Sequence, residues 1–166
     1  MFKYSIQEKA GDAGIEPMKI TFKGDYALKI MLDLSLEYGG ALVQMKEIAR
    51  RQDIPKKFLE QIVLILKGAK YIRTVRGPKG GIALAKEPAK ITVGEIIRLI
   101  EGPTAPIACV STTGREKCDF ENRCVFREVF GEITSLINDV VDKITFADIV
   151  ERHVALGRKR VMDFSI

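Results

Sequence analysis

Three cysteines are the residues of this chain best suited to chemistry, and they are confined to one short segment. Cys109, Cys118 and Cys124 follow the spacing C-x8-C-x5-C. Structural zinc sites usually pair cysteines about two to four residues apart, a spacing that is absent here. Thiolates on a flexible segment suit an iron–sulfur cluster, which takes soft ligands from several directions. The spacing therefore favours a cluster over zinc, with three unrelated reduced cysteines as the alternative.

The compartment expected from the sequence is one in which these thiols stay reduced. An odd number of cysteines, three in all, argues against a disulfide framework. The longest aliphatic run, residues 62–66, is far below the roughly 20 residues needed to span a bilayer. The first residues contain no apolar signal-peptide segment. We therefore expect a cytoplasmic protein.

The segment that carries the cysteines is predicted to be a loop between two helices. Residues 102–123 are rich in Pro, Thr, Gly and Cys and lack apolar periodicity. Loops of this length in compact domains are usually functional or disordered. Before the loop, Thr92 is predicted to cap a helix that ends at Gly102-Pro103.

A long helix is predicted from Cys124 onward, with apolar residues alternating every three and four positions. Such a seam is typical of a helix that packs against a partner helix, and a core helix within one domain is the alternative. We favour a dimer interface, because Val125, Val129, Leu136 and Val141 widen the apolar stripe beyond what one small domain can cover. A shorter helix over Phe146–Leu156 and a basic tail follow. The predicted seam consists of Phe126, Phe130, Ile133, Ile137, Val140 and Ile144.

Positive charge is concentrated in one third of the chain. Residues 41–90 contain twelve lysines and arginines against four acidic residues, a net charge of +8, whereas the whole chain carries +5. A local excess of this kind is the electrostatic pattern of a nucleic-acid-binding module, although a solvated basic face would look the same.

The same stretch has the order of elements of a winged helix-turn-helix. Helical periodicity is present over residues 25–38 and 43–51, and Gln52–Ile54 reads as a tight turn. Pro55 then suits the first position of a third helix. The apolar residues Phe58, Ile62, Ile65 and Leu66 are predicted to form its buried face. Lys56, Lys57, Glu60 and Gln61 lie on the opposite side. Residues 71–76 and 82–84 flank a Gly/Pro turn and predict a hairpin, the wing.

In this order the motifs resemble the IscR/NsrR (Rrf-two) family of bacterial winged-helix regulators, many of which sense iron–sulfur status or nitric oxide. The segments that carry the resemblance span nearly all of residues 18–154. They are MKITFKGDYALKIMLDL (Met18–Leu34), IPKKFLEQI (Ile54–Ile62), IRTVRGPKGGIALAKEP (Ile72–Pro88), ITVGEIIRLIEG (Ile91–Gly102) and the three-cysteine loop.

The resemblance implies specific contacts with DNA. Glu60 and its neighbours would read bases from the recognition helix, and Arg76 of the wing would enter the minor groove. The chemistry agrees, because a carboxylate can accept from cytosine, Gln61 can pair with adenine, and arginine fits a narrow minor groove. Lys56, Lys57 and Lys79 are expected to contact phosphates. The alternative for Glu60 is a surface residue paired with a neighbouring lysine.

The resemblance also implies a fourth ligand for the cluster. In the iron–sulfur-assembly regulators this ligand is a histidine three residues after the last cysteine, a position held here by Arg127. In the nitric-oxide-sensing branch an aspartate early in the first helix of the partner subunit completes the site, and Asp25 aligns with it. The alternative for Asp25 is an acid in the first helical turn that faces the helix dipole.

We therefore predict a mainly α protein with a small β-hairpin wing and a long dimerisation helix. The predicted function is a homodimeric transcriptional regulator, a repressor, that binds pseudo-palindromic double-stranded DNA under the control of a 4Fe-4S or 2Fe-2S cluster. The alternative is a cluster-free member of the family controlled by a metabolite or a protein partner. No motif supports an enzyme. The predicted parts are an N-terminal extension (1–17), the DNA-binding domain (18–102), the cluster-binding loop (103–124), the dimerisation and terminal helices (125–157) and a basic tail (158–166).

Overall fold

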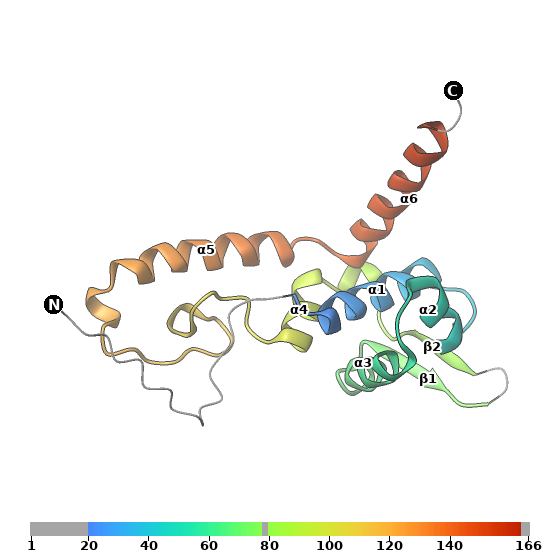
Figure 1. Ribbon diagram of the computed structural model, residues 1–166, viewed down its shortest axis with the longest axis horizontal. Coiled ribbons are helices and arrows are strands. Elements are labelled where there is room, and N and C mark those ends of the chain that lie inside the picture. The colour runs from blue at the N-terminus through green and yellow to red at the C-terminus, as the bar shows by residue number, and fades with distance from the viewer. Residues whose placement is uncertain (1–19, 78–79, 164–166) are drawn as a thin grey trace.

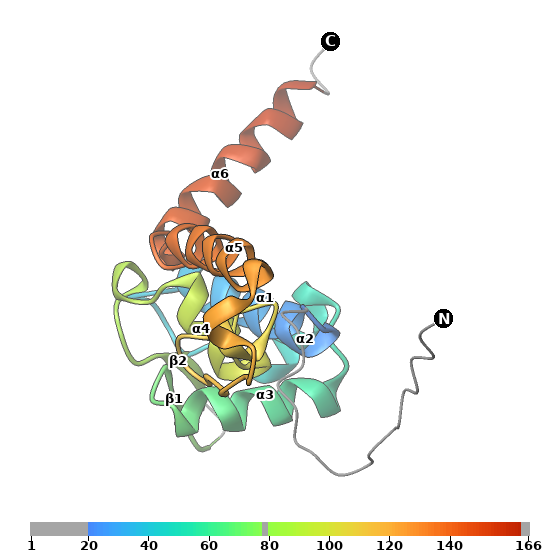
Figure 2. The same cartoon turned by 90° about the vertical axis from the view of Figure 1, so that its left-hand side faces the viewer.

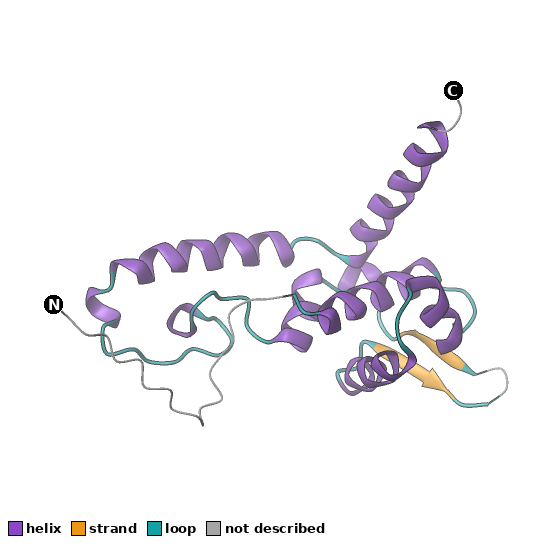
Figure 3. Ribbon diagram, viewed as in Figure 1, coloured by secondary structure: helices purple, strands orange, loops and turns teal. Residues whose placement is uncertain are grey.

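The computed structural model describes residues 20–77 and 80–163, with side chains described as far as Gly157. The predicted N-terminal extension, residues 1–17, and Lys79 of the predicted wing lie outside these ranges. The structure is mainly helical with one small antiparallel sheet, as predicted (Figures 1 and 3). The main elements are α1 (Phe22–Leu36), α2 (Met45–Gln52), α3 (Lys56–Gly68), β1 (Ile72–Val75), β2 (Gly81–Leu84), α4 (Val93–Glu101), α5 (Val125–Val141) and α6 (Phe146–Asp163).

The first helix, α1, is the centre of the core. It packs against α2, α3, α4, α6 and β2. Its predicted apolar face is confirmed, because Ala27, Ile30, Met31 and Leu34 are all buried. The helix begins three residues before the predicted Asp25, since the hydroxyl of Thr21 accepts from the backbone N–H groups of Lys23 and Gly24 and caps the helix there.

The helices α2 and α3 form the predicted helix-turn-helix. Asp53 adopts a left-handed conformation (φ 51°) and ends α2, and the buried Ile54 leads into α3. Pro55 is the N-cap of α3 and not its first residue. The buried face of α3 consists of Leu59, Ile62, Val63 and Leu66.

The predicted buried face of α3 was therefore wrong at two of its four residues. Phe58 is 43% exposed and Ile65 is only partly buried, whereas Leu59 and Val63 enter the core. Phe58 instead packs edge-on against the Tyr26 ring, with 5.9 Å between ring centroids. The apolar residues of α3 cover a wide arc of the helix, so either the predicted or the observed face could have been buried. The packing of α3 against α1 decides which of the two is buried.

The wing is the hairpin β1–β2, paired from Ile72 opposite Leu84 to Val75 opposite Gly81. Val43, predicted as the start of the second helix, instead forms a backbone bridge to Ile82, with N–O distances of 2.9 and 2.8 Å. This close approach requires glycine at position 81, because a Cβ there would overlap the Val43 carbonyl. The hairpin is thereby joined to the strand-like segment that enters α2.

The C-terminal helices are joined to the core through the segment that connects them. The backbone of Ile144 accepts from Val93, and Phe146 donates to Ile91, both at 2.9 Å. Phe146 is 1% exposed and belongs to the core. Figure 2 shows α6 projecting away from the body beyond this anchor. The helix runs to Asp163, past Leu156 where its end was predicted, so the first residues of the predicted basic tail are helical.

The predicted loop lies between α4 and α5. The predicted cap is confirmed, since Thr92 and Glu95 form a capping box at the start of α4. After Gly102 the chain contains only two short 3-10 turns, Ala108–Val110 and Glu121–Arg123, before α5 begins. In Figure 1 this loop runs alongside α5. Within residues 20–77 and 80–163, no helix is long and apolar enough to cross a membrane.

Candidate nucleic-acid interface and cysteine pocket

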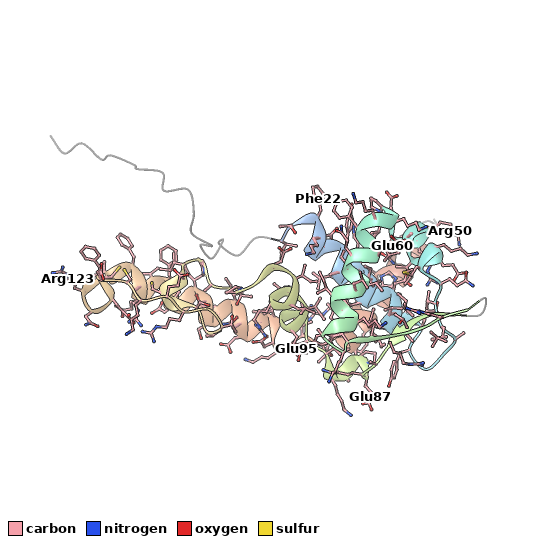
Figure 4. All side chains as sticks on the ribbon, turned by 90° about the horizontal axis from the view of Figure 1, so that it is seen from below. Phe22, Arg50, Glu60, Glu87, Glu95 and Arg123 are labelled. Carbon is pink, nitrogen blue, oxygen red and sulfur yellow. The ribbon has the colours of Figure 1, made fainter. Side chains whose placement is uncertain are left out.

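The predicted reading residues lie on the exposed side of α3. Lys56, Lys57, Glu60 and Gln61 are all exposed, in the N-terminal half of the helix. The ammonium group of Lys56 lies 3.8 Å from the Glu60 carboxylate, which is the pairing weighed as the alternative for Glu60. At this exposure such a pair contributes little and can be exchanged for contacts with a ligand. Figure 4 shows α3 from below, with Glu60 labelled on it and Arg50 on the neighbouring α2.

A groove of about 720 Å³ between α3 and the hairpin brings together Glu60 and Arg76, two of the residues predicted to contact bases, whereas Gln61 is not among its lining residues. Glu60 lines it from α3, and Arg76 lines it from the residue after β1. Apolar side chains, Val63, Leu64 and Val75 among them, also line it. The groove thus lies between a helix and a wing and is lined by both charged and apolar side chains.

Two lysines of this groove were not singled out from the sequence. Lys46 of α2 and Lys67 of α3 line it together with Lys56. Helical spacing contained the signal for Lys67, because residues 56, 60, 63 and 67 follow one face of an α-helix. Nothing in the sequence placed Lys46 beside them, because its position depends on how α2 packs against α3 in the folded chain.

A buried carboxylate holds α2 against α1 and so helps to place α3. Asp33 is 3% exposed and accepts from Arg51 at 2.5 Å and from Gln52 at 3.0 Å. Arg51 also donates to Glu37 at 3.1 Å. Burial alone would lower the pKa of Arg51, but the hydrogen bonds and the attraction to Asp33 and Glu37 outweigh burial and raise this pKa. The guanidinium therefore stays charged and closes the α1–α2 contact.

The structure gathers two of the three cysteines. Cys109 and Cys124 are partly buried and line one open pocket of about 480 Å³, whereas Cys118 is exposed and is not among its lining residues. Cys124 is the N-cap of α5, so this pocket lies at the start of the long helix. Among the described residues, no three His, Cys, Asp or Glu side chains are grouped closely enough to hold a metal ion.

Charged groups on the same pocket are paired with one another. Glu121 accepts from Arg115 and from Arg127, the latter at 2.8 Å. The Arg127 Nε is buried and has no hydrogen-bond partner among the described residues. The sequence identified Arg127 only as the position where a histidine would be expected, and it contained no signal for Glu121 or Arg115.

Asp25 lies in the first turn of α1 and is not among the residues that line the cysteine pocket of its own chain. Its carboxylate forms an ion pair with Lys29 at 2.7 Å, and Thr21 rather than Asp25 caps the helix. The same turn is tied to the end of α4, because Glu101 accepts from the Thr21 backbone at 2.9 Å and from its hydroxyl at 2.8 Å. The turn that carries Asp25 is therefore connected to the residue just before the cysteine loop.

The predicted dimerisation seam divides into outward-facing and inward-facing residues. Phe126, Ile133 and Val140 are exposed, and Phe130 and Ile137 are partly buried. The seam was wrong at Ile144, because α5 ends at Val141 and the Ile144 backbone pairs with Val93. The exposed apolar residues of α5 form one stripe along the helix, called here the α5 stripe: Val125, Phe126, Val129, Ile133, Leu136 and Val140.

The chain is similar to known transcriptional regulators over most of its length. Residues 20–152 match the Rrf2 family, described as an iron-dependent transcriptional regulator family. A relative from Rhodobacter capsulatus, described as an rrf2-like HTH-type transcriptional regulator, is 36% identical over 137 residues, which cover 79% of this chain and 91% of the relative.

Solved structures agree with this match. The structure of CymR, described as the global cysteine regulator of B. subtilis, is 34% identical with a TM-score of 0.70, covering 81% of this chain and 97% of CymR. The structure of T. potens IscR is 35% identical with a TM-score of 0.65, covering 81% of this chain and 88% of that one. These relatives regulate transcription, and the chain is likewise no enzyme. It has their winged-helix fold and belongs to the Rrf2 family of HTH-type transcriptional regulators.

Proposed function

We propose that this protein is a homodimeric repressor that binds a pseudo-palindromic operator and releases or engages it according to the state of an iron–sulfur cluster. The observation that carries the proposal is the pocket that Cys109 and Cys124 share at the start of α5. It joins two of the chain's three thiols to the helix that carries the α5 stripe. A chemical change at these thiols would therefore take place next to the surface proposed to pair two copies of the chain.

The DNA contacts are proposed along the groove between α3 and the hairpin. Glu60 on the groove and Gln61, exposed next to it on α3, present groups that can pair with base edges in a major groove. Arg76 lines the groove from the hairpin side and is proposed to reach the minor groove. Lys56 and Lys57 are exposed on the same helical turn and suit phosphates. Lys79, which lies between the two hairpin strands in the sequence, is proposed for the same role from its charge alone.

The dimer is proposed through the α5 stripe. Its six side chains are exposed, with Val125 at 71% and Leu136 at 65%, and no described segment of the chain covers them. An apolar stripe along one helix is the surface by which two copies of a protein pair symmetrically. Such pairing would place two recognition helices at a fixed spacing, as a palindromic site requires.

The donor set fits a soft metal cluster better than a single hard ion. Three thiols supply soft ligands, two of them already lining one pocket, and the exposed Cys118 lies on the loop between them. The N-terminal end of α5 at Cys124 favours negative charge. Cys109, Cys118 and Cys124 would hold the cluster, and Asp25 of the other protomer would complete it. When bound, the cluster supplies redox-active iron, the target for nitric oxide or oxidants.

The proposed control acts through contacts of this chain. Asp25 on one protomer and the cysteines of the other would together fix α1 against the partner's loop. The Glu101–Thr21 hydrogen bonds join the Asp25 turn to the start of the loop in the same chain. Loss of the cluster would release the Asp25 turn and the cysteine loop from the partner subunit. This release would alter the spacing of the two recognition helices.

A second candidate is control without a cluster, by a metabolite or a protein partner. Two features favour it: Asp25 is already paired with Lys29, and Cys118 lies apart from the pocket that holds the other two thiols. The similarity to CymR, a protein described as a cysteine regulator, supports the same interpretation.

Anaerobic purification separates these candidates. We expect brown wild-type protein with stoichiometric iron and sulfide, and a colourless but folded dimer when all three cysteines are replaced by serine. Operator binding should then no longer respond to nitric oxide. Colourless wild-type protein after reconstitution with iron and sulfide, or unchanged control of the operator in the triple variant, would favour the second candidate.

A further inference from the structure

Arg127 carries an unexplained buried donor in the cysteine pocket. Its Nε is the only buried side-chain nitrogen or oxygen without a hydrogen-bond partner within the described part of the chain. Buried donors in native proteins are nearly always paired, and an exception calls for a partner that is missing from the free chain. The question is which acceptor this nitrogen serves.

The charged neighbours of Arg127 do not supply that acceptor. Glu121 accepts from Arg127 through a terminal nitrogen at 2.8 Å, and it also pairs with Arg115. Glu128, the other carboxylate on the pocket wall, is exposed and makes no ion pair with Arg127. The two guanidinium groups and two carboxylates cancel in formal charge. What the pocket offers an anionic ligand is therefore a directed N–H group and not a net positive charge.

Among the other side chains that line the pocket, Ser111 Oγ already accepts from the backbone N–H groups of Thr113 and Gly114, which leaves the two cysteine sulfurs as acceptors. Arg127 lies one helical turn after Cys124, and its backbone N–H donates to the Cys124 carbonyl at 3.2 Å. Side chains on an α-helix lean toward its N-terminus, so the Arg127 side chain extends over the turn that begins at Cys124. Cys109 lines the same pocket. Thiolate and sulfide sulfurs accept N–H hydrogen bonds when they ligate iron.

We propose that Arg127 donates a hydrogen bond from Nε to a sulfur of the cluster, and that Glu121 positions the guanidinium for this contact. The inference rests on the proposed cluster and assigns a role to two residues that are not ligands. Hydrogen bonds to cluster sulfurs make reduction easier, and the residues that support metal ligands affect retention of the metal. Arg127 should thus raise the reduction potential of the cluster and slow its loss.

The test uses the full-length protein, reconstituted anaerobically with iron and sulfide. Arg127→Lys keeps the positive charge but removes the N–H group from the middle of the side chain. We expect its reduction potential to shift to more negative values and its cluster to be retained about tenfold less well. Arg115→Lys makes the same chemical change in the other partner of Glu121 and should leave the potential near that of wild type. Glu121→Gln should give a smaller negative shift, because it loosens the guanidinium without removing Nε.

The possible outcomes are distinct. If Arg127→Lys and wild type have the same potential, the sulfur contact does not exist. If Arg115→Lys shifts the potential as much as Arg127→Lys, disturbance of the shared Glu121 pairing, and not a directed hydrogen bond from Arg127, is responsible. Thermal unfolding of the cluster-free proteins reports any purely structural role, which would lower the melting temperature without moving the potential. Wild-type protein that takes up no cluster overturns both this inference and the proposed function, and its spectrum alone reveals that case.

Discussion

Glu60 and Lys57 lie one turn apart on the exposed side of α3, and we expect them to contribute to DNA binding in different ways. Glu60→Gln should lower the discrimination between operator and random DNA by about 1–3 kcal/mol, because the variant lacks a carboxylate that accepts from cytosine. Affinity for random DNA should not fall, since a negative charge is removed at the same time. Binding to a site selected from a random pool, compared with bulk DNA, measures the difference.

Lys57→Ala, one turn earlier on the same exposed side of α3, is the matched control. An interaction with phosphate carries no sequence information, so this variant should weaken binding to all sequences alike. The slope of log affinity against log salt should become shallower by about 0.9, because the variant neutralises one phosphate fewer. If Glu60→Gln behaves like Lys57→Ala, or binds with unchanged discrimination, Glu60 is a surface residue paired with Lys56 and not a reading residue.

At the scale of the element, the start of α6 depends on a cap whose strength varies with pH. Asp148 accepts from the Thr145 backbone at 2.8 Å and from its hydroxyl at 2.7 Å. The backbone and hydroxyl hydrogen bonds from Thr145 hold the pKa of Asp148 below its ordinary value of 3.8. A lowered pKa in the folded protein means that the charged form stabilises the fold above pH 3.8 and that this contribution disappears as the pH falls through the lowered pKa.

The prediction for this cap concerns the stability difference between wild type and Asp148→Asn. Above about pH 5 the variant should unfold at lower urea concentration, because it lacks the charge that the Thr145 groups stabilise. The two proteins should converge as the pH falls below about 4. Glu151→Gln, an exposed change one turn further along α6, serves as the control and should show no such convergence. A pH-independent gap would mean that the cap acts through its hydrogen bonds alone.

At the scale of the whole molecule, the question is what covers the α5 stripe. Leu136→Glu places a charge in the middle of this stripe, where the side chain is 65% exposed in the single chain. We expect the dimer to dissociate and operator affinity to drop by at least about tenfold, because one protomer reaches only half of a two-fold site. Sedimentation velocity and operator titration on the same sample measure both effects.

Ser135→Glu is the control for the same helix. Ser135 is exposed outside the apolar stripe, so the added charge should leave the dimer intact. Helical content should be equal in the two variants. A monomeric Ser135→Glu protein, or a dimeric Leu136→Glu protein, would place the dimer interface elsewhere on the molecule.

Local patterns in the sequence determined most of the secondary structure. Thr92 and Glu95 cap α4 as their spacing predicts, because a capping box involves only neighbouring residues. The buried face of α1 and the position of the hairpin also follow from short-range periodicity and from the Gly/Pro turn. The family followed from the order of these motifs along the chain, and the match over residues 20–152 bears it out.

Contacts between distant residues were decided only by the tertiary structure. Apolar residues cover a wide part of the circumference of α3. The packing against α1 therefore determines that Leu59 rather than Phe58 is buried. Burial of Phe146 and the backbone pairing of Ile144 depend on residues in and around the start of α4, far earlier in the chain, which no local period encodes. The cysteine spacing likewise pointed to a shared site, but only the fold placed Arg127, Glu121 and two of the thiols on one pocket at the start of α5.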